Sequence, residues 1–369
     1  MNPRTPVVVG VGQVLNRSKD LDDAIEPIQM MLKALYRAEE DSGARLLDQV
    51  GSVRVIRGVW DYGNPAGFIA ERIASPNPET MGTLFGGNQV QAVLNRSCLD
   101  ILSGDHDLIV LTGAENGSSS NRARKQGIQL RSTSISGSPD EIVGSQKPEH
   151  HEFEVAKGIK QAIQVYPMYE NAIRYARGET LDEHLVRVSE LWSRFNEAGL
   201  ENPNAWIQTR HSAEEIRTPS SSNRAVSYPY TKMMNANMVV DMGAALILCS
   251  VEKAKQLGIE EGKWVYPYAG VQGYDHFSAS VRDNFVESPG VRITGRRVMD
   301  LACTAAEELE YVDLYSCFPS AVQVAAKELG LSEDRPLTVT GGLTFGGGPL
   351  NNYVMHSVAR TVELLRANP

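Results

Sequence analysis

Cysteine is scarce in this sequence, which has four in 369 residues: Cys98, Cys249, Cys303 and Cys317. No two of them form a Cys-x-x-Cys pair, and each lies among apolar residues. This spacing excludes the usual zinc motifs and offers no framework of disulfides. We therefore interpret the four residues as reduced cysteines of a cytoplasmic protein.

Long apolar runs and an excess of basic charge are also missing. No stretch approaches the roughly 18 apolar residues of a membrane-spanning helix, and the N-terminal MNPRTPVVVGVGQ has no secretory pattern. Lys plus Arg number 36 against 45 Asp plus Glu, which gives a net charge of −9. This balance argues against a general nucleic-acid binder. We expect neither a membrane span nor a nucleic-acid partner.

Two glycine-rich stretches lack the residues that would make them nucleotide motifs. TGGLTFGGGPLNN, residues 340–352, has no Lys-Ser/Thr pair and no basic residue before Arg360, so it is not a phosphate-binding P-loop. VVVGVGQVL, near the N-terminus, has Gly10 and Gly12 but places Leu15 at the third glycine position of the dinucleotide fingerprint. An NAD-dependent dehydrogenase thus remains only a poor alternative, because the sequence lacks the full dinucleotide-binding motif.

What the sequence does have is an alternation of buried strands and amphipathic helices. This order predicts an α/β fold with a parallel-rich sheet covered on both faces. Long polar stretches interrupt the order between residues 115 and 235, where we expect an insertion. We expect the first of these stretches, ENGSSSNRARKQG (115–127), to be a loop. The predicted strands are residues 7–12, 50–58, 79–85, 106–115, 242–250, 264–272, 312–317 and 337–341. The predicted helices are residues 22–40, 65–74, 89–103, 167–177, 180–198, 296–310, 320–329 and 350–365.

The chain also contains a repeated pattern: TLFGGNQVQAVL (83–94) resembles LTFGGGPLNNYVM (343–355). Both are Phe-Gly-Gly turns that lead from a predicted strand into a predicted helix. In each half, a strand, a helix and a second strand precede the turn at nearly equal spacing. Equal order at equal spacing indicates a duplicated unit.

Duplicated α/β halves with these turns resemble the thiolase superfamily. VDMGAALILCS (240–250) is similar to the family's Asp-Gly-Ala-Ala strand, with Met242 intervening. VDLYSCFPSA (312–321) is similar to the His-Asp-Cys-Phe segment of thiolases of the sterol-carrier-protein-2 (SCP2) type. TGGLTFGGGPLN is similar to their Ser-Gly-Gly-Leu-x-x-x-Gly-His-Pro-Leu-Gly segment. The resemblance covers nearly the whole chain.

The resemblance implies a thiolase-like fold, in which duplicated βαβαβαββ halves form a five-layered αβαβα core with an inserted loop domain. Residues 1–114 plus 236–250 would be the N-terminal half, 115–235 the loop domain, and 251–369 a C-terminal half that lacks its last two strands. We therefore expect either a longer native polypeptide with a further C-terminal domain or a partner chain that completes the sheet. Relatives pair through the strand at residues 79–84. This strand has few of the charged residues that prevent an open sheet edge from pairing with another chain, so we also expect a homodimer.

The resemblance further implies an acyltransferase of the acetyl-CoA acetyltransferase family, active in lipid metabolism, with coenzyme A or acyl-CoA as ligand and no covalently bound cofactor. The family's nucleophilic cysteine, however, aligns with Gly87, and its activating histidine aligns with Gly348. Tyr315 occupies the oxyanion position, and only Cys317 persists. Glycine can act neither as nucleophile nor as base. We predict an acyl-CoA-handling protein without the ordinary mechanism; a non-catalytic acyl-CoA-binding or scaffolding subunit is the alternative.

Other polar groups are candidates for the vacant roles, and each has a structural alternative. The candidate catalytic residues are Tyr315, Cys317, Asn88 and His356. Their alternatives are a packed tyrosine, a small buried cysteine, a helix cap and a packed helix histidine. Asn351 and Asn352 also suit helix capping. EHHEFE (149–154) reads as a solvated acidic loop, so we expect no metal site.

Binding of coenzyme A is implied by the same resemblance. We expect Gly87 and Gly348 to face each other across one cavity, with Tyr315 or Cys317 nearby. The positive charges of the inserted region would bind phosphate, or would be simply solvated. The candidate binding residues are Gly86, Gly87, Gly346, Gly347, Gly348, Arg122, Arg124 and Lys125.

Overall fold

The computed structural model of the chain describes residues 2–148 and 150–368. The chain folds into two compact units, each made of segments that are far apart in the sequence. Unit 1 comprises Met1–Ser145, Met238–Tyr268 and Gly348–Pro369. Unit 2 comprises Gln146–Asn237 and Ala269–Gly347. The boundaries expected from the family resemblance remain predictions.

Unit 1 is built on a six-stranded sheet with the strand order β1-β8-β4-β2-β3-β5. β2 is parallel to β3 and β4, and β3 is parallel to β5, whereas β8 is antiparallel to β1 and β4. The strands are β1 (Pro6–Leu15), β2 (Ser52–Val55), β3 (Glu79–Thr83), β4 (Leu108–Asn116), β5 (Glu141–Val143) and β8 (Asp241–Ser250). The helices of this unit are α1 (Pro27–Ser42), α2 (Pro65–Arg72), α3 (Gln89–Ser103), α4 (Gly117–Gln126), α9 (Val251–Gln256) and α12 (Tyr353–Ala367).

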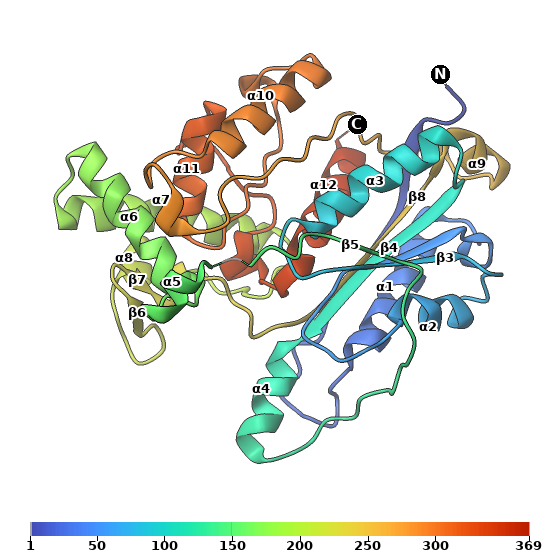
Figure 1. Cartoon of the computed structure of the whole chain (residues 1–369), viewed down its shortest axis with the longest axis horizontal. Coiled ribbons are helices and arrows are strands. Elements are labelled where there is room, and N and C mark those ends of the chain that lie inside the picture. The colour runs from blue at the N-terminus through green and yellow to red at the C-terminus, as the bar shows by residue number, and fades with distance from the viewer. Residues whose placement is uncertain (1, 149, 369) are drawn as a thin grey trace. The chain divides into compact units, whose positions relative to one another are not determined.

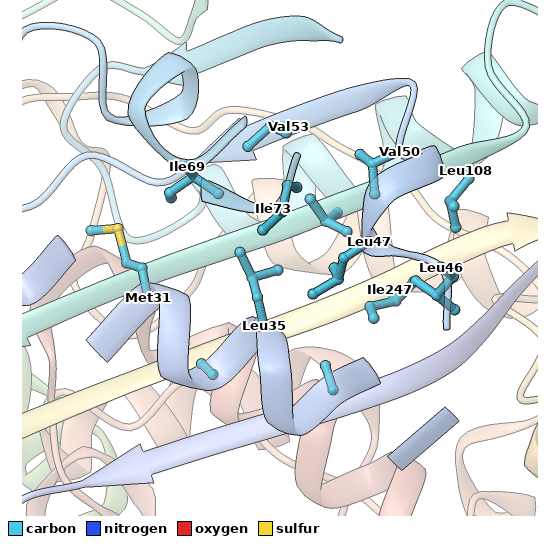
Figure 2. Close-up of a cluster of buried hydrophobic side chains, with 14 of the residues drawn as sticks. Met31, Leu35, Leu46, Leu47, Val50, Val53, Ile69, Ile73, Leu108 and Ile247 are labelled. Atoms are coloured by element: carbon cyan, nitrogen blue, oxygen red, sulfur yellow. The ribbon is translucent and has the colours of Figure 1, made fainter. Parts of the chain in front are cut away.

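Both faces of this sheet are buried, which explains its uninterrupted apolar strands. Successive residues of a strand point to opposite faces. Leu108 of β4 accordingly belongs to one hydrophobic core, and its neighbour Ile109 belongs to the other. Helices α1 and α2 cover the first face, and α3 and α12 cover the second (Figure 1). Figure 2 shows the first core, which includes Leu35 of α1, Ile69 of α2 and Ile247 of β8.

The two glycines of the N-terminal GVG run allow α1 to pack closely on β1. A Cβ at Gly10 would lie 2.2 Å from the carbonyl oxygen of Ala38, and one at Gly12 would lie 2.0 Å from that of Ala34. Both distances are far below van der Waals contact, so a side chain would force the helix away from the strand. These glycines serve helix packing, and nothing in their geometry calls for the dinucleotide interpretation.

The polar segment after β4, which we predicted to be a loop, forms helix α4 instead. Its first residues contain no apolar stripe, but a carboxylate from a neighbouring strand holds its N-terminus. Asp241 of β8 accepts hydrogen bonds from the backbone N–H groups of Ser118 (2.8 Å) and Ser119 (3.0 Å) and from the Ser119 hydroxyl (2.5 Å). A carboxylate at this position satisfies free N–H groups and favours the helix dipole. The loop expectation was wrong because this cap is distant in sequence.

Unit 2 is mainly helical, with a core in which Trp192 and Phe195 stack at 4.8 Å. Its helices are α5 (Glu152–Ala156), α6 (Ala162–Arg177), α7 (Leu181–Glu201), α8 (Ala213–Arg217), α10 (Pro289–Ala302) and α11 (Pro319–Leu329). Strands β6 (Ala225–Ser227) and β7 (Tyr230–Thr231) form a small antiparallel pair. Single-turn helices of the whole chain are Leu47–Gln49, Lys232–Met234, Glu261–Lys263, Ala279–Val281, Ala306–Glu308, Gly342–Gly346 and Leu350–Asn352.

A buried polar cluster joins α6, α7 and α11 inside this second unit. The fully buried carboxylate of Glu170 accepts hydrogen bonds from Gln323 (2.6 Å) and from the Tyr230 hydroxyl (2.7 Å). His184 Nε2 lies 2.9 Å from the same carboxylate, and its Nδ1 lies 2.7 Å from Glu179. Because every oxygen of Glu170 has a partner, the burial of this charge is compensated.

Three strands predicted in the second half are not formed in the described residues. Residues 312–317 and 337–341 form no strand; they share the hydrogen bond from Leu314 N–H to the Leu337 carbonyl (2.9 Å), without a continuing ladder. The carboxylate of Asp313 instead takes the N–H groups of Val339 (3.0 Å) and Thr340 (3.3 Å). Side-chain bonds of this kind compete with a strand ladder. Of residues 264–272, Val265 alone makes an isolated bridge, to Val8.

The expected open edge at β3 is also wrong, because β5 pairs with it. Met81, Gly82 and Thr83 of β3 align with Glu141, Ile142 and Val143 in parallel register. The carboxylate of Asp140 fixes this pairing by accepting the N–H (2.9 Å) and hydroxyl (2.7 Å) of Thr80. The sequence pattern does not reveal β5, because the strand is three residues long and none of its residues is buried.

We predict that the purified protein is a monomer at micromolar concentration, because a dimer through β3 would require β5 to detach. Light scattering coupled to size-exclusion chromatography measures the mass directly, for which the monomer value is 40.4 kDa. Substituting Asp140 with alanine should weaken the cover over β3 and raise the dimer fraction. A stable dimer of the unsubstituted chain would contradict this prediction.

Candidate functional site

The glycine turn that precedes α3 is fixed by the residues that begin α12. The N–H of Gly86 donates to Asn351 Oδ1 at 3.2 Å, and Asn351 Nδ2 donates to the carbonyl of Arg57 at 2.7 Å. Next to it, Asn352 Nδ2 donates to the carbonyl of Gly113 at 2.7 Å. The two asparagines therefore clamp the ends of β2 and β4 and the turn after β3. Their side chains do not cap α12, so the capping alternative is wrong.

An open cavity of about 420 Å³ lies beside this turn. It is lined by the loop after β2, from Arg57 to Asp61, and by Phe85. The loop is held by three bonds: Arg57 N–H to Thr83 Oγ1 (2.9 Å), Val59 N–H to Glu115 Oε1 (2.9 Å) and Trp60 Nε1 to the carbonyl of residue 114 (3.2 Å). A cavity with a fixed wall can bind a small molecule without a large ordering cost.

Glu115, at the end of β4, is the functional candidate that the sequence analysis missed. Its side chain is almost fully buried behind the cavity wall, and burial raises the pKa of its carboxyl to about 7. The Val59 N–H and the positive charge of Arg57 partly offset that rise in pKa. A carboxyl that titrates near neutrality beside a cavity is a candidate acid or base. An acidic residue ending the buried run LIVLTGAE was the available signal.

A side chain at position 58 would collide with this arrangement. A Cβ on Gly58 would lie 2.2 Å from Trp60 Nε1 and 2.5 Å from Glu115 Oε1. Glycine thus lets the backbone of the loop pass directly over the buried carboxyl. The cavity wall and Glu115 are consequently one structural element.

Two of the predicted catalytic residues belong to this unit and have different surroundings. Asn88 is exposed at the start of α3 and makes no side-chain cap, so it can still reach a ligand at the turn. His356 is buried in α12, with Nδ1 2.8 Å from Gln13 Oε1. Its Nε2 has no hydrogen-bond partner among the described residues. Burial lowers the pKa of His356 to about 3, so the imidazole is neutral; its surroundings favour the packed-histidine alternative.

Tyr315 and Cys317 both lie in unit 2, on the extended segment before α11. Tyr315 is about 39% exposed. Burial raises the pKa of the Cys317 thiol to about 11, despite the hydrogen bond from the nearby Tyr166. A thiol with this pKa is protonated at neutral pH, and it is the thiolate that reacts. Cys317 therefore lacks the environment of an activated nucleophile.

The glycine run of unit 2 is packed against protein, since residues 341–347 are all buried. Gly341 and Gly342 have φ of +92° and +66°, which few other residues adopt. A Cβ at Gly341 would lie 2.6 Å from Gly199 Cα in α7, and one at Gly346 would lie 2.7 Å from the carbonyl oxygen of Thr340. At Gly341, Gly342 and Gly346 the close approach is thus to the protein's own backbone and side chains. Gly347 and Gly348, which follow, are buried as well.

The proposed phosphate-binding charges differ among themselves. Arg122 is tied into unit 1, where it donates to the carbonyl of Ser18 at 2.6 Å and to Ser118 Oγ at 3.2 Å. Arg124 and Lys125 are exposed in the last turn of α4. Arg124 donates to Asn121 Oδ1 at 3.0 Å within its own helix, but both exposed side chains can meet solvent or an anionic ligand, whereas Arg122 is held by bonds to other parts of unit 1.

No metal centre emerges from the described part of the chain. Among residues 2–148 and 150–368, no three His, Cys, Asp or Glu side chains are grouped so as to hold an ion. Glu149, the first residue of EHHEFE, lies outside the described residues. In the same ranges, no helix is both long and apolar enough to cross a membrane.

Replacing Glu115 with glutamine should stabilise the protein at alkaline pH. The folded-state pKa of about 7 exceeds the ordinary value of 4.5, so the unfolded state loses its proton first as pH rises. Stability is therefore lost between about pH 4.5 and 7. Glu115→Gln should raise the free energy of unfolding at pH 8 by about 2–3 kcal/mol, with little effect at pH 4.5. Urea unfolding at both pH values measures this, with exposed Glu40→Gln as control; equal effects at both values would contradict it.

Replacing His356 with glutamine should change the pH dependence in the opposite direction. Its folded-state pKa of about 3 lies below the ordinary 6.5, so the unfolded state binds the proton first as pH falls. Stability is then lost as pH falls from about 6.5 to 3. Relative to wild type, His356→Gln should gain about 2 kcal/mol on going from pH 7 to pH 5. Urea unfolding compares the two proteins, with exposed His276→Gln as control; a constant difference between the two would argue against a buried neutral histidine.

Comparison with known proteins adds family information to this geometry. No protein-family model matches the chain. The acetyl-CoA acetyltransferase of Methanocaldococcus jannaschii is 22% identical over 238 residues, which cover 64% of this chain and 53% of that protein. The match thus spans about half the length of that curated relative.

Solved structures match over nearly the whole chain. A monomeric SCP2-thiolase like protein type 1 from Mycobacterium smegmatis is 28% identical, with a TM-score of 0.81, over 100% of this chain and 73% of its own. An Ltp2-ChsH2(DUF35) aldolase (18% identity, TM-score 0.70, 100% and 91% coverage) and an acetyl-CoA acetyltransferase from Syntrophomonas wolfei (14%, 0.62, 98% and 93%) share the fold. The predicted thiolase-like α/β fold is confirmed, and the chain is a member of the thiolase superfamily.

Proposed function

We propose that this protein handles acyl-CoA thioesters without the cysteine–histidine mechanism of ordinary thiolases. One observation carries this proposal: the aligned nucleophile and base positions hold Gly87 and Gly348. Glycine has no side chain that can attack a thioester or accept a proton. Similarity to two proteins named acetyl-CoA acetyltransferases supports a coenzyme A thioester as the ligand.

The cysteines nearest the expected site do not restore the missing nucleophile. Cys98 is three turns into α3 from Gly87, and burial raises its pKa to about 11. Cys317 has a similarly raised pKa. Both thiols are protonated at neutral pH, so neither supplies the thiolate on which an acyl-enzyme depends.

What unit 1 retains is a place for a polarised carbonyl. The turn from Phe85 to Asn88 ends at the N-terminus of α3, whose free N–H groups favour negative charge. Exposed Asn88 adds a side-chain donor. We place the thioester carbonyl at this turn, next to the cavity behind whose wall Glu115 is buried. In this arrangement the protein binds and polarises the thioester but forms no covalent bond to it.

Aldol-type cleavage is a second candidate, favoured by the combination of a missing nucleophile and a carboxyl that titrates near neutrality. One structural neighbour is named an aldolase. Retro-aldol cleavage of a 3-hydroxyacyl thioester breaks the bond between C2 and C3. A base takes the hydroxyl proton, the C3 carbon leaves as a ketone, and C2 is protonated as the acyl thioester forms. This reaction needs a base and a polarised carbonyl but no acyl-enzyme.

Partners and location follow only as proposals. The neighbouring aldolase is named as an assembly with a DUF35 protein, which supports a partner chain for this protein as well. The covered β3 edge removes the argument for a homodimer through that strand. A role in lipid metabolism in the cytoplasm fits an acyl-CoA ligand.

We predict saturable binding of coenzyme A without thiolysis. Isothermal titration with coenzyme A should give a defined stoichiometry, whereas acetoacetyl-CoA with free coenzyme A should yield no acetyl-CoA above background. Intact-mass spectrometry after incubation with acetyl-CoA should show no added acetyl group. Cys317→Ala should leave all three results unchanged.

Three outcomes would separate the alternatives. A stable acetyl adduct would show that a nucleophile is present and that our assignment of positions is wrong. Release of acetone from 3-hydroxy-3-methylbutyryl-CoA, lost in Glu115→Gln, would establish the aldol candidate. Absence of coenzyme A binding would reject the proposed function.

A further inference from the structure

The cavity beside the glycine turn combines apolar walls with one uncompensated positive charge. Val59 and Phe85 are 67% and 49% exposed, which is high for side chains of this size that share one cavity. Trp60 forms part of the same wall. An apolar surface with few charged groups, here Arg57 and Asp61, is the usual character of a small-molecule site.

The positive charge belongs to Arg57. Its guanidinium carbon lies 4.9 Å from the centre of the Trp60 ring, a cation–π distance. Among the described residues, no carboxylate forms an ion pair with this guanidinium. Glu115 acts on it only at longer range. Asp61, the acidic residue of the lining, is exposed at the other end of the loop. Arg57 is therefore available to an anionic group that enters the cavity.

The position of Arg57 relative to the glycine turn is fixed by one side chain. The carboxamide of Asn351 bonds both the Gly86 N–H and the Arg57 carbonyl. Phe85, the residue before Gly86, is itself part of the cavity wall. A group bound at the start of α3 is thus a short distance from Arg57, with Phe85 between them.

We propose that this cavity holds the acyl part of the ligand and that Arg57 selects acyl groups carrying a second, anionic group such as a carboxylate. This inference rests on the proposed function, because it takes the thioester carbonyl to lie at the glycine turn. The hydrocarbon part lies on Phe85, Val59 and Trp60, and the distal carboxylate meets the Arg57 guanidinium. The substrate class is a carboxyacyl thioester rather than a simple fatty acyl thioester.

Free hexanoate and hexanamide test the cavity without coenzyme A. The two molecules have the same size and differ in charge, and Trp60 reports on binding through its fluorescence, with Trp60→Phe as background. Hexanoate should bind at least about tenfold more tightly than hexanamide, as expected for a charge-assisted contact. Arg57→Gln should abolish the preference, and Arg57→Lys should retain part of it.

Arg72→Gln is the matched control, since Arg72 is in the same unit with its guanidinium 4.4 Å from the Phe68 ring, outside the cavity lining. It should keep the full preference for hexanoate. Equal binding of hexanoate and hexanamide, no binding of either, or a preference that survives Arg57→Gln would overturn the inference. Loss of coenzyme A binding with an intact hexanoate preference would instead reject the proposed function and the thioester placement while leaving the anion site in the cavity established.

Discussion

The clamp formed by Asn351 and Asn352 is the constraint on which the rest of the site depends. Both side chains are buried. Asn351 bonds the N–H of Gly86, in the turn after β3, and the carbonyl of Arg57, which follows β2. Asn352 bonds the carbonyl of Gly113 in β4. A Cβ at Gly113 would lie 2.4 Å from Asn352 Oδ1, so glycine is required opposite the clamp. Replacing either asparagine with alanine would leave buried backbone groups without hydrogen-bond partners, and each such group lowers the free energy of unfolding by about 1–3 kcal/mol. Asn351 thereby holds the turn next to Phe85 and the first residue of the cavity wall, Arg57, while Thr83 and Glu115 hold the rest of that wall.

A site without a nucleophile has to work through charge and proton transfer. The cysteine and histidine of ordinary thiolases make and break a covalent bond, whereas the described groups of unit 1 offer helix N–H donors, an arginine and a carboxyl. Burial tunes that carboxyl to titrate near neutrality, and the loop over it can approach because residue 58 is glycine. In the proposed function, these groups bind and polarise a thioester in place of covalent chemistry.

Local patterns in the sequence predicted most elements of unit 1 but missed α4, α9 and β5, and they did not reveal interactions between residues distant in the sequence. The end of α3 was predicted at Ser103 because Gly104 follows it, and the structure agrees. Helix α4 was missed because its cap, Asp241, lies over a hundred residues away. The strands predicted in the second half do not form, because the Asp313 carboxylate accepts the hydrogen bonds of N–H groups that a strand ladder would need. Glu115 was overlooked because its burial depends on the loop of residues 57–61, which covers it only in the folded protein.

Two of the buried titratable groups of unit 1, Glu115 and His356, oppose each other in their effect on stability. Glu115 makes the folded state less stable as pH rises from about 4.5 to 7, and His356 makes it less stable as pH falls from about 6.5 to 3. Where the windows overlap, the folded state has one proton fewer than the unfolded state at position 356 and one more at position 115. The two slopes cancel there, so the contribution of this pair is nearly flat between about pH 4.5 and 6.5. Each single substitution exposes a slope that the wild-type protein hides, and the double substitution should restore a flat profile.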